Sequence, residues 1–290
     1  MGNGRSWEKR HGEPLDDRSR TSRNPSVYRT AMPPTLPPEI LDLIVDHLGG
    51  EPITLKLCCL VSNLWVPRTR RHLFARVEFD PEKSPIESWM KTFPDPSNSP
   101  AHYTRSLSIS DLPILAASSS NPHTWICAFR HLECLSISMT WSDDVQDALL
   151  PFHGLSPTLR SLSIACHLTP LSDIFDFVCS FPSIEDLELT SVHYGPADTW
   201  IIPQASPKFT GVLRIGKAST LHGTRSAIRC LVDLPDGLHF SKILADGCCE
   251  TELTIDLLPR CFDTLETLRI TRLWSGALLS ASTVGSLPIT

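Results

Sequence analysis

The sequence lacks the features that assign a chain to a membrane or to the secretory route. Its 290 residues hold no apolar run near the roughly 18 that a membrane-spanning helix needs, and the first thirty contain no apolar signal core. There is no C-x-x-C pair and no N-x-S/T site with a permitted middle residue. The ten cysteines are scattered. We therefore expect a cytoplasmic or nuclear protein whose cysteines act as small apolar side chains.

The sequence also lacks complete motifs for metal binding, nucleotide binding or nucleophilic catalysis. The eleven histidines form no H-E-x-x-H and no zinc-ligand spacing. Residues 211–219, GVLRIGKAS, approach a phosphate-binding loop, but Ala218 replaces the Mg²⁺-binding hydroxyl and the inner residues read as a strand. GLSPT around Ser156 lacks the second glycine of a nucleophile elbow. The sequence therefore predicts no catalytic residue, no metal, no cofactor and no enzymatic activity.

The chain has a moderate number of charged residues and a slightly negative net charge. Charged residues make up 20% of the chain and the net charge is −6, while apolar residues make up 41%. Basic residues exceed acidic ones only in residues 1–35, so the body has no patch suited to nucleic acid. The composition is that of a globular protein with one large or two modest domains.

Residues 1–35 have the composition of a disordered basic tail, rich in Arg, Ser, Gly and Asn. The start, MGNGRS, fits the acceptor pattern for N-myristoylation at Gly2, with Arg5, Lys9 and Arg10 nearby to favour anionic lipid. The alternative is a chance match in a polar tail. A single acyl chain would add only weak membrane association.

Residues 36–80 carry three short helical patterns. The first is LPPEILDLIVDHL (36–48), where Pro37 or Pro38 suits the first turn and Gly49-Gly50 ends the helix. The second is residues 53–65, with apolar residues at helical spacing, and Pro67 closes it. Pro67 also opens the third, PRTRRHLFARV, in which Leu73, Phe74 and Val77 are expected to point inward and Arg68, Arg70 and Arg71 toward solvent.

The first helix has more apolar surface than one packing face uses. At about 100° per residue, its apolar side chains Ile40, Leu41, Ile44, Val45 and Leu48 span about 140° of the circumference. Leu43 widens this arc to about 200°, whereas a helix on a core needs about 100°. The surplus is either buried by the C-terminal region or offered to another protein.

Residues 81–102 contain five prolines and are predicted to be a connector with a short helix around residues 86–93. Beyond it, in residues 103–290, a strand core of apolar-x-apolar type recurs every 25 to 30 residues. The cores are centred on Leu107, Leu135, Leu162, Leu187, Leu213, Ile243 and Leu268, of which the units at Leu213 and Ile243 match poorly.

A third apolar residue precedes four of these cores, which gives L-x-x-L-x-[LI], the strand pattern of leucine-rich repeats. LSDIFDFVCSF (171–181) is a candidate helix between two strands. The Asn or Cys usual after the strand core is absent: Thr140, His167, Val192 and Leu273 occupy those positions. The repeats are therefore irregular, and an unrelated α/β or β-rich domain is the alternative.

The two N-terminal motifs LPPEILDLIVDHL and LKLCCLVSNLWVPRTRRHLF resemble the F-box, whose pattern runs L-P-x-E-[IL]-[IL] and later apolar-V-[SC]-x-x-W. The ending W-x-P-R-x-R-x-H-L-F looks like F-box proteins numerous in mushroom-forming fungi, which often carry leucine-rich repeats behind the box. Asn63-Leu64 departs from the family, which often has a basic or polar residue before the tryptophan. The fold class expected from this resemblance is α/β, a small three-helix F-box (36–80) followed by an irregular leucine-rich-repeat-like α/β solenoid (103–290).

The resemblance implies the function of a substrate receptor in a cullin–RING (SCF-type) ubiquitin ligase, which serves ubiquitin-dependent protein degradation. The box would dock on a Skp-family adaptor, and through it on a cullin, while the repeats hold an unknown protein substrate. By position, the adaptor-binding residues would be Leu36, Pro37, Ile40, Leu41, Ile44, Val61 and Trp65, with Trp65 either at the interface or bracing the helices. The strand positions expected to face the substrate are Ser108, Ser136, Ser163, Glu188, Arg214 and Arg269.

The competing hypothesis is a repeat scaffold without ligase association. In such a scaffold the first helix would cap the repeats and bury the same apolar residues. A pull-down with a Skp-type adaptor separates the two hypotheses, and Ile40→Asp should lower the global stability of a scaffold but change that of a receptor little.

Overall fold

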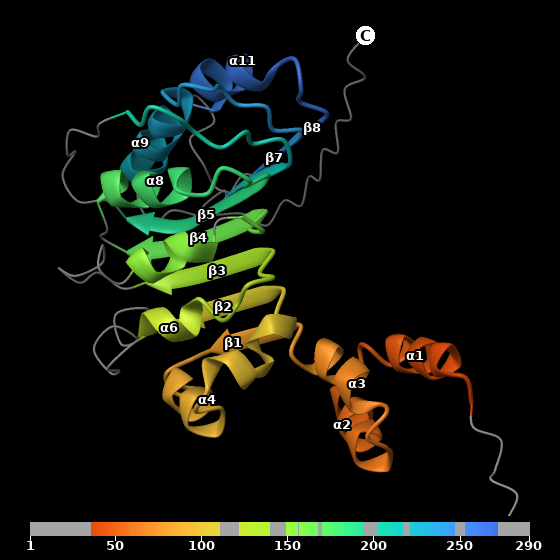
Figure 1. Ribbon diagram of the computed structural model, residues 1–290. Coiled ribbons are helices and arrows are strands. Elements are labelled where there is room, and N and C mark those ends of the chain that lie inside the picture. The colour runs from red at the N-terminus through yellow and green to blue at the C-terminus, as the bar shows by residue number, and fades with distance from the viewer. Residues whose placement is uncertain are drawn as a thin grey trace, which may run out of the picture. The chain divides into compact units, whose positions relative to one another are not determined.

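The described residues of the chain include one parallel sheet of eight strands (Figure 1). The computed structural model describes residues 36–110, 122–139, 149–155, 157–167, 170–193, 202–216, 221–246 and 253–271. The strands are β1 (Arg76–Phe79), β2 (Ser106–Ser110), β3 (Cys134–Met139), β4 (Ser161–His167), β5 (Asp186–His193), β6 (Val212–Ile215), β7 (Lys242–Asp246) and β8 (Thr267–Thr271). The α/β class predicted from the sequence is confirmed.

Helices precede and separate these strands. The α-helices are α1 (Pro38–His47), α2 (Pro52–Val61), α3 (Val66–Leu73), α4 (Ile86–Thr92), α6 (Pro122–Ile126), α8 (Leu171–Cys179), α9 (Leu221–Val232) and α11 (Leu258–Cys261). Three further described segments are 3₁₀ helices: η1 (Pro96–Asn98), η2 (Pro100–Tyr103) and η3 (Leu150–Leu155). The segment η4 (Leu253–Leu257) is a turn of π-helix.

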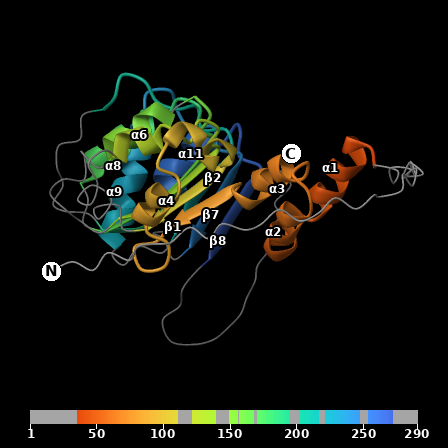
Figure 2. The ribbon, with the colours of Figure 1, turned by 60° about the horizontal axis from the view of Figure 1, so that its bottom comes forward.

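The strand order in the sheet is the order in the chain, from β1 to β8, and every neighbouring pair is parallel. Each connection therefore advances the sheet by one strand in the same direction. Because such crossovers are right-handed, they bring the connecting segments to one face. Figure 2 shows α4, α6, α8, α9 and α11 on the same side of the strands.

The seven strand cores predicted from the repeat all lie in strands and in one register. The paired row runs Leu107, Leu135, Leu162, Leu187, Leu213, Ile243 and Leu268, and Val77 of β1 precedes it. The poorly matching units at Leu213 and Ile243 keep this register. Of the four apolar residues predicted three positions earlier, Leu132, Leu159 and Ile184 are fully buried and Leu265 is half-buried.

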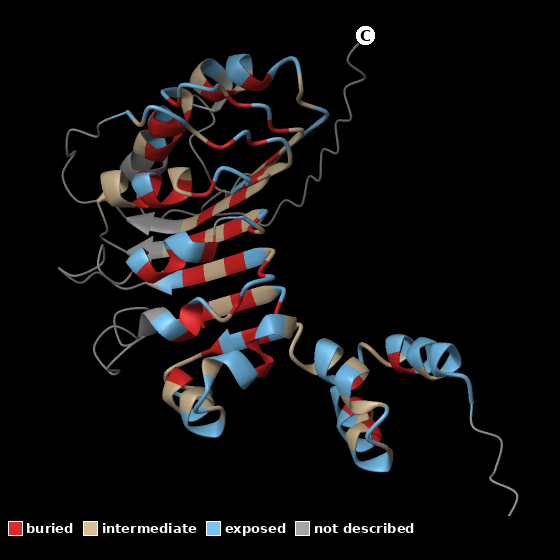
Figure 3. Ribbon diagram, in the orientation of Figure 1, coloured by how far each residue is buried: buried red, intermediate tan, exposed pale blue. Residues whose placement is uncertain are grey.

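Along β1, β2, β6 and β7 the side chains alternate between a buried face and a half-buried or exposed face (Figure 3), whereas β8 has no buried residue and its core residue Leu268 is 38% exposed. In β2, Leu107 and Ile109 are buried, whereas the three serines between and beside them are half-buried. Parallel sheets are usually apolar on both faces because helices cover both. Here one face of the sheet is apolar, and the opposite face carries mainly serine and charged side chains.

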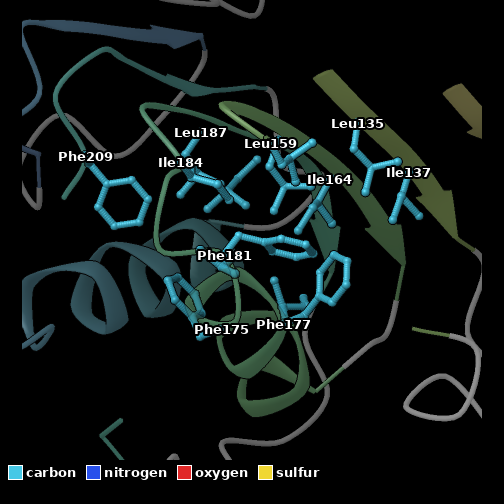
Figure 4. Packing of buried hydrophobic residues seen from close by; sticks show 14 of the residues in the cluster. Leu135, Ile137, Leu159, Ile164, Phe175, Phe177, Phe181, Ile184, Leu187 and Phe209 are labelled. Carbon is cyan, nitrogen blue, oxygen red and sulfur yellow. The ribbon is translucent and has the colours of Figure 1, made fainter. Parts of the chain in front are cut away.

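The core lies between the sheet and the helical layer (Figure 4). Helix α8 directs Phe175 and Phe177 toward the sheet, and Phe181 follows in the next turn. The rings of Phe177 and Phe181 meet edge to face with centroids 4.9 Å apart, a favoured aromatic geometry. The prediction of a helix in residues 171–181 is confirmed, with α8 ending at Cys179, and its buried side chains are Ile174, Phe175, Phe177 and Val178.

The structure corrects the third helical pattern. Helix α3 ends at Leu73, and the predicted last turn instead leads into β1, where Val77 and Phe79 are buried and Arg76 and Glu78 are exposed. A strand forms here because β2 offers a pairing edge for residues 76–79. The second pattern is also shorter than predicted, since α2 ends at Val61.

The proline-rich segment 81–102 contributes to the core. The predicted helix in it is present as α4, and its side chain Ile86 is buried, as is Ala101 in η2. Trp89 of α4 packs against Phe74, with centroids 5.8 Å apart, and against Phe79 at the same distance. The segment therefore packs on the beginning of the sheet in addition to connecting two regions.

Backbone hydrogen bonds link neighbouring units just before each strand. The carbonyl of Arg105 accepts from the N–H groups of both Glu133 and Cys134. Thr158 Oγ1 adds a bond of 2.8 Å to the carbonyl of Leu132. Of the residues at the usual Asn position, His167 ends β4 and Val192 lies in β5, whereas Thr140 and Leu273 lie outside the described residues, as does the N-terminal tail with Gly2.

A glycine is required where β5 meets β6. Asp186 Oδ1 accepts a hydrogen bond of 2.6 Å from the N–H of Val212, and a Cβ added at Gly211 would overlap this carboxylate oxygen. We expect Gly211→Ala to lower the free energy of unfolding by about 2 kcal/mol, because the displaced carboxylate leaves the Val212 N–H without its partner. Urea denaturation measures the change.

Gly50→Ala is the matched control for this substitution, because its Cβ would meet no atom within 4 Å. It should change stability by less than about 0.5 kcal/mol. Adding Asp186→Ala to Gly211→Ala removes the overlap, so the double variant should lose less stability than the two single variants together. Strictly additive losses would contradict the proposed overlap.

Candidate protein-binding surface

Helix α1 divides its apolar residues between two sides. It begins at Pro38, carries Glu39 in its first turn where the helix dipole favours acid, and ends before the Leu48–Gly50 turn. Val45 is buried, and Leu41 and Leu48, four residues before it and three after, are half-buried. These three residues form the packed side of α1.

The other side of α1 faces solvent. Ile40, Leu43 and Ile44 are 42%, 64% and 38% exposed. The wide apolar arc predicted from the sequence therefore has a packed part and an open part.

Helix α2 shows the same division more strongly. Leu55 and Cys58 are buried, whereas five apolar residues at positions 53, 57, 60, 61 and 64 are between 58% and 83% exposed. The spacing of Ile53, Leu57, Leu60 and Val61 places these four residues on one side of α2, and Leu64 lies just beyond the end of the helix. We call the exposed set the α1–α2 apolar residues: Ile40, Leu43, Ile44, Ile53, Leu57, Leu60, Val61 and Leu64.

A hydrogen-bonded clasp holds α1 to α3. Arg68 Nε donates to Asp46 Oδ1 over 2.7 Å, a second guanidinium nitrogen of Arg68 pairs with Oδ2, and His72 Nε2 lies 2.8 Å from Oδ1. The hydrogen bonds from Arg68 and then His72 hold the pKa of the Asp46 carboxyl well below its usual range. Arg68 is half-buried in this pair, which corrects the expectation that it is simply solvated.

A second contact joins α2 to α3. Thr69 is fully buried, and its Oγ1 donates to the carbonyl of Trp65 over 2.8 Å and lies 2.8 Å from Cys59 Sγ. Trp65 stands at the start of α3 and is half-buried. The packed sides of α1 and α2 thus both connect to α3, which leaves their other sides open.

Acid should loosen the Asp46 clasp. Because its folded-state pKa is depressed, the carboxylate stabilises the fold above its unfolded pKa of about 3.9, and this stabilisation is lost as the pH falls below that value. The group is largely solvated, so we expect a contribution below about 1 kcal/mol. Thermal melts between pH 7 and pH 3 should show a smaller pH dependence for Asp46→Asn than for the wild type.

Glu82→Gln serves as the control, because Glu82 is exposed and its side chain takes no part in the clasp. It should retain the wild-type pH dependence. If Asp46→Asn also retains it, the clasp does not couple folding to pH.

The residues predicted to bind an adaptor fall in two groups. Leu36 and Pro37 precede α1 and are exposed, as are Ile40, Ile44 and Val61. Leu41 and Trp65 are half-buried. Ile53, Leu57, Leu60 and Leu64 are exposed as well and were not among the predicted residues, although the helical spacing of the first three was a signal for a shared side.

Three cysteines in the core, the half-buried Cys179 and the buried Cys230 and Cys261, have thiols of low reactivity. Burial raises the pKa of the Cys179 and Cys230 thiols to about 12 and that of Cys261 to about 11. These thiols stay protonated at neutral pH and are poor nucleophiles. Within the described ranges, His, Cys, Asp and Glu side chains form no group of three or more that could hold a metal ion.

The half-buried face of the sheet is polar. One paired row runs Glu78, Ser108, Ser136, Ser163, Glu188, Arg214, Leu244 and Arg269, and it includes all six positions that the sequence analysis assigned to a substrate face. Small hydroxyl side chains occupy its centre and charged ones its flanks. This row differs in character from the α1–α2 apolar residues.

None of the helices in the described segments combines the length and apolar character that crossing a bilayer requires. Residues 211–216 of the phosphate-loop-like stretch hold strand β6, as their apolar inner residues predicted. Comparisons with models of known families, with curated proteins and with solved structures find no match for this chain.

Proposed function

We propose that this chain is a substrate receptor of a cullin–RING ubiquitin ligase. In this proposal α1–α3 are an F-box that docks on a Skp-family adaptor, and the parallel sheet with its helices is a leucine-rich-repeat-like solenoid that holds a protein substrate. The receptor performs no chemistry, and it would act in the cytosol or the nucleus. The observation that carries the proposal is the exposure of the α1–α2 apolar residues.

Exposed apolar side chains in this number are typical of a surface that another protein covers. Three of them, Ile40, Ile44 and Val61, occupy the positions that the F-box resemblance assigns to adaptor contact. The nearby residues Val45 and Leu55 are buried, so the exposure is confined to one side of each helix. Apolar anchors on a helix that enters a groove are a common form of protein recognition.

The sheet supports the second half of the proposal. Strand cores 25 to 30 residues apart, paired in one register and ordered as in the chain, are what stacked leucine-rich repeats require. A scaffold without ligase association would instead bury Ile40 and its neighbours as a cap. Their exposure favours the receptor.

Titration of the purified chain with a Skp-family adaptor tests the proposal. We expect a one-to-one complex with a Kd below about 1 µM, because several apolar anchors are available. Addition of the cullin should extend it to a ternary complex on size exclusion. Absence of adaptor binding at tens of micromolar would contradict the proposed function.

A further inference from the structure

A groove runs along the amino-terminal edge of the sheet, where the chain enters each strand. Its first hollow, about 550 Å³, is lined by residues that precede β2 to β6, and its second, about 560 Å³, by residues that precede β6 to β8. Thr210 lines both hollows, so they are adjacent along this edge. We call them together the edge groove. Each hollow has the size of an ordinary ligand pocket.

Most charges in the first hollow neutralise one another. Arg105 pairs with Glu133, and Arg160 pairs with Glu185. Each pair joins two neighbouring units at equivalent positions, two residues before the row of strand cores. These four side chains therefore form a wall of alternating sign with little net charge.

Three other charges have no such partner. Lys208 lines the first hollow, and Asp263 and Glu266 line the second. All three are exposed, and none of them forms an ion pair with any residue in the described parts of the chain. The edge groove thus has an unpaired cation on one side of Thr210 and unpaired anions on the other.

The spacing of these charges sets the size of a complementary ligand. Lys208 precedes β6, and the two acids precede β8, two strands further along the sheet. Neighbouring strands lie about 4.8 Å apart, so the opposite charges are separated by about 10 Å along the edge. This is close to the rise of one three-residue turn of polyproline II helix, about 9 Å, which brings side chains i and i+3 to the same side. Phe262, which is 69% exposed, lines the second hollow and offers an apolar contact.

We propose that the edge groove binds a peptide segment in polyproline II conformation that carries an acidic and a basic side chain three residues apart. The acidic side chain pairs with Lys208, and the basic one pairs with Asp263 and Glu266. Charge complementarity of both signs selects this ligand over a polyanion, which the acids repel, and over a uniformly basic segment, which Lys208 repels. Its role as a substrate-recognition site rests on the proposed function, whereas the binding itself does not.

Fluorescence polarisation with the full chain tests the proposal. Three labelled peptides of equal length serve as probes, with the pairs Glu/Lys, Glu/Glu and Lys/Lys three residues apart in a Gly-Ser-Ala background. We expect the Glu/Lys peptide to bind at least about fivefold more tightly than the other two at low salt. Equal binding of all three peptides would overturn the proposal.

Charge reversal makes the test specific. Lys208→Glu should shift the preference to the Lys/Lys peptide, and the double variant Asp263→Lys with Glu266→Lys should shift it to the Glu/Glu peptide. Lys91→Glu changes an exposed lysine on α4 outside the groove and should keep the wild-type ranking. If both reversals also keep that ranking, the groove is not the binding site.

The peptide assay contains no adaptor, so the two proposals fail separately. Peptide selectivity without adaptor binding would contradict the ligase receptor and uphold the edge groove. Adaptor binding without peptide selectivity would do the reverse.

Discussion

Ile40→Asp is expected to weaken binding of the Skp-family adaptor by at least about 100-fold, which corresponds to about 2.7 kcal/mol. Ile40 lies on the open side of α1, where an apolar anchor would enter the adaptor. An aspartate there would bring an unpaired carboxylate into an apolar contact, which is costly. Calorimetric titration of the variant against the wild type measures the loss.

Two further variants separate binding from folding. Leu150→Asp changes a similarly exposed apolar residue, at 53%, in η3 and should leave adaptor affinity unchanged. Val45→Asp places the charge on the buried side of α1, where Val45 is 1% exposed, and should unfold the helices. If Ile40→Asp lowers the melting temperature as much as Val45→Asp, the side chain of Ile40 is a packing residue and not a docking residue.

Phe181→Ala is expected to lower the free energy of unfolding by about 4 kcal/mol. Phe181 is fully buried between the helical layer and the sheet, next to Phe177 and close to Ile184 (Figure 4). Truncation removes most of its buried apolar area and leaves a cavity that surrounding strands, fixed by their ladder of hydrogen bonds, fill only in part. Chemical denaturation followed by circular dichroism measures the change.

Phe262→Ala provides the comparison, because this ring is 69% exposed. The same truncation should cost less than about 0.5 kcal/mol there. A loss below about 1 kcal/mol for Phe181→Ala would mean that packing of the Phe181 ring contributes little to the stability of the fold.

The repeat made most of the sheet predictable. Seven strands follow from one spacing and one apolar-x-apolar core, and even the poorly matching units at Leu213 and Ile243 hold the register. Strand β1 was missed because it follows a helical pattern directly. A signal for it was present: Val77 and Phe79 have the same alternation, and Val77 precedes Leu107 by 30 residues, within the range of the repeat.

The exposure of the helices was harder to predict. Periodicity indicates which residues of α1 share a side, but not which part of a wide apolar arc is covered. That depends on contacts with α3, such as the clasp of Asp46 with Arg68, which join residues 22 positions apart. The seven predicted adaptor-binding residues therefore include two, Leu41 and Trp65, that are half-buried.

The edge groove could not be predicted from the sequence. Lys208 and Glu266 belong to different units and become neighbours along one edge only through the stepwise order of the strands. Individually they read as ordinary surface charges. They stand out only once the structure shows that the other charged side chains of the first hollow pair with one another.

The stepwise order of the strands also has an evolutionary consequence. Each inner strand contacts only the strand before it and the strand after it, and all the interfaces use the same apolar row. Duplication or deletion of one whole unit would therefore leave two surfaces that still match. A protein built this way can lengthen or shorten its binding edge by single units, and so acquire new partners, without redesigning its core.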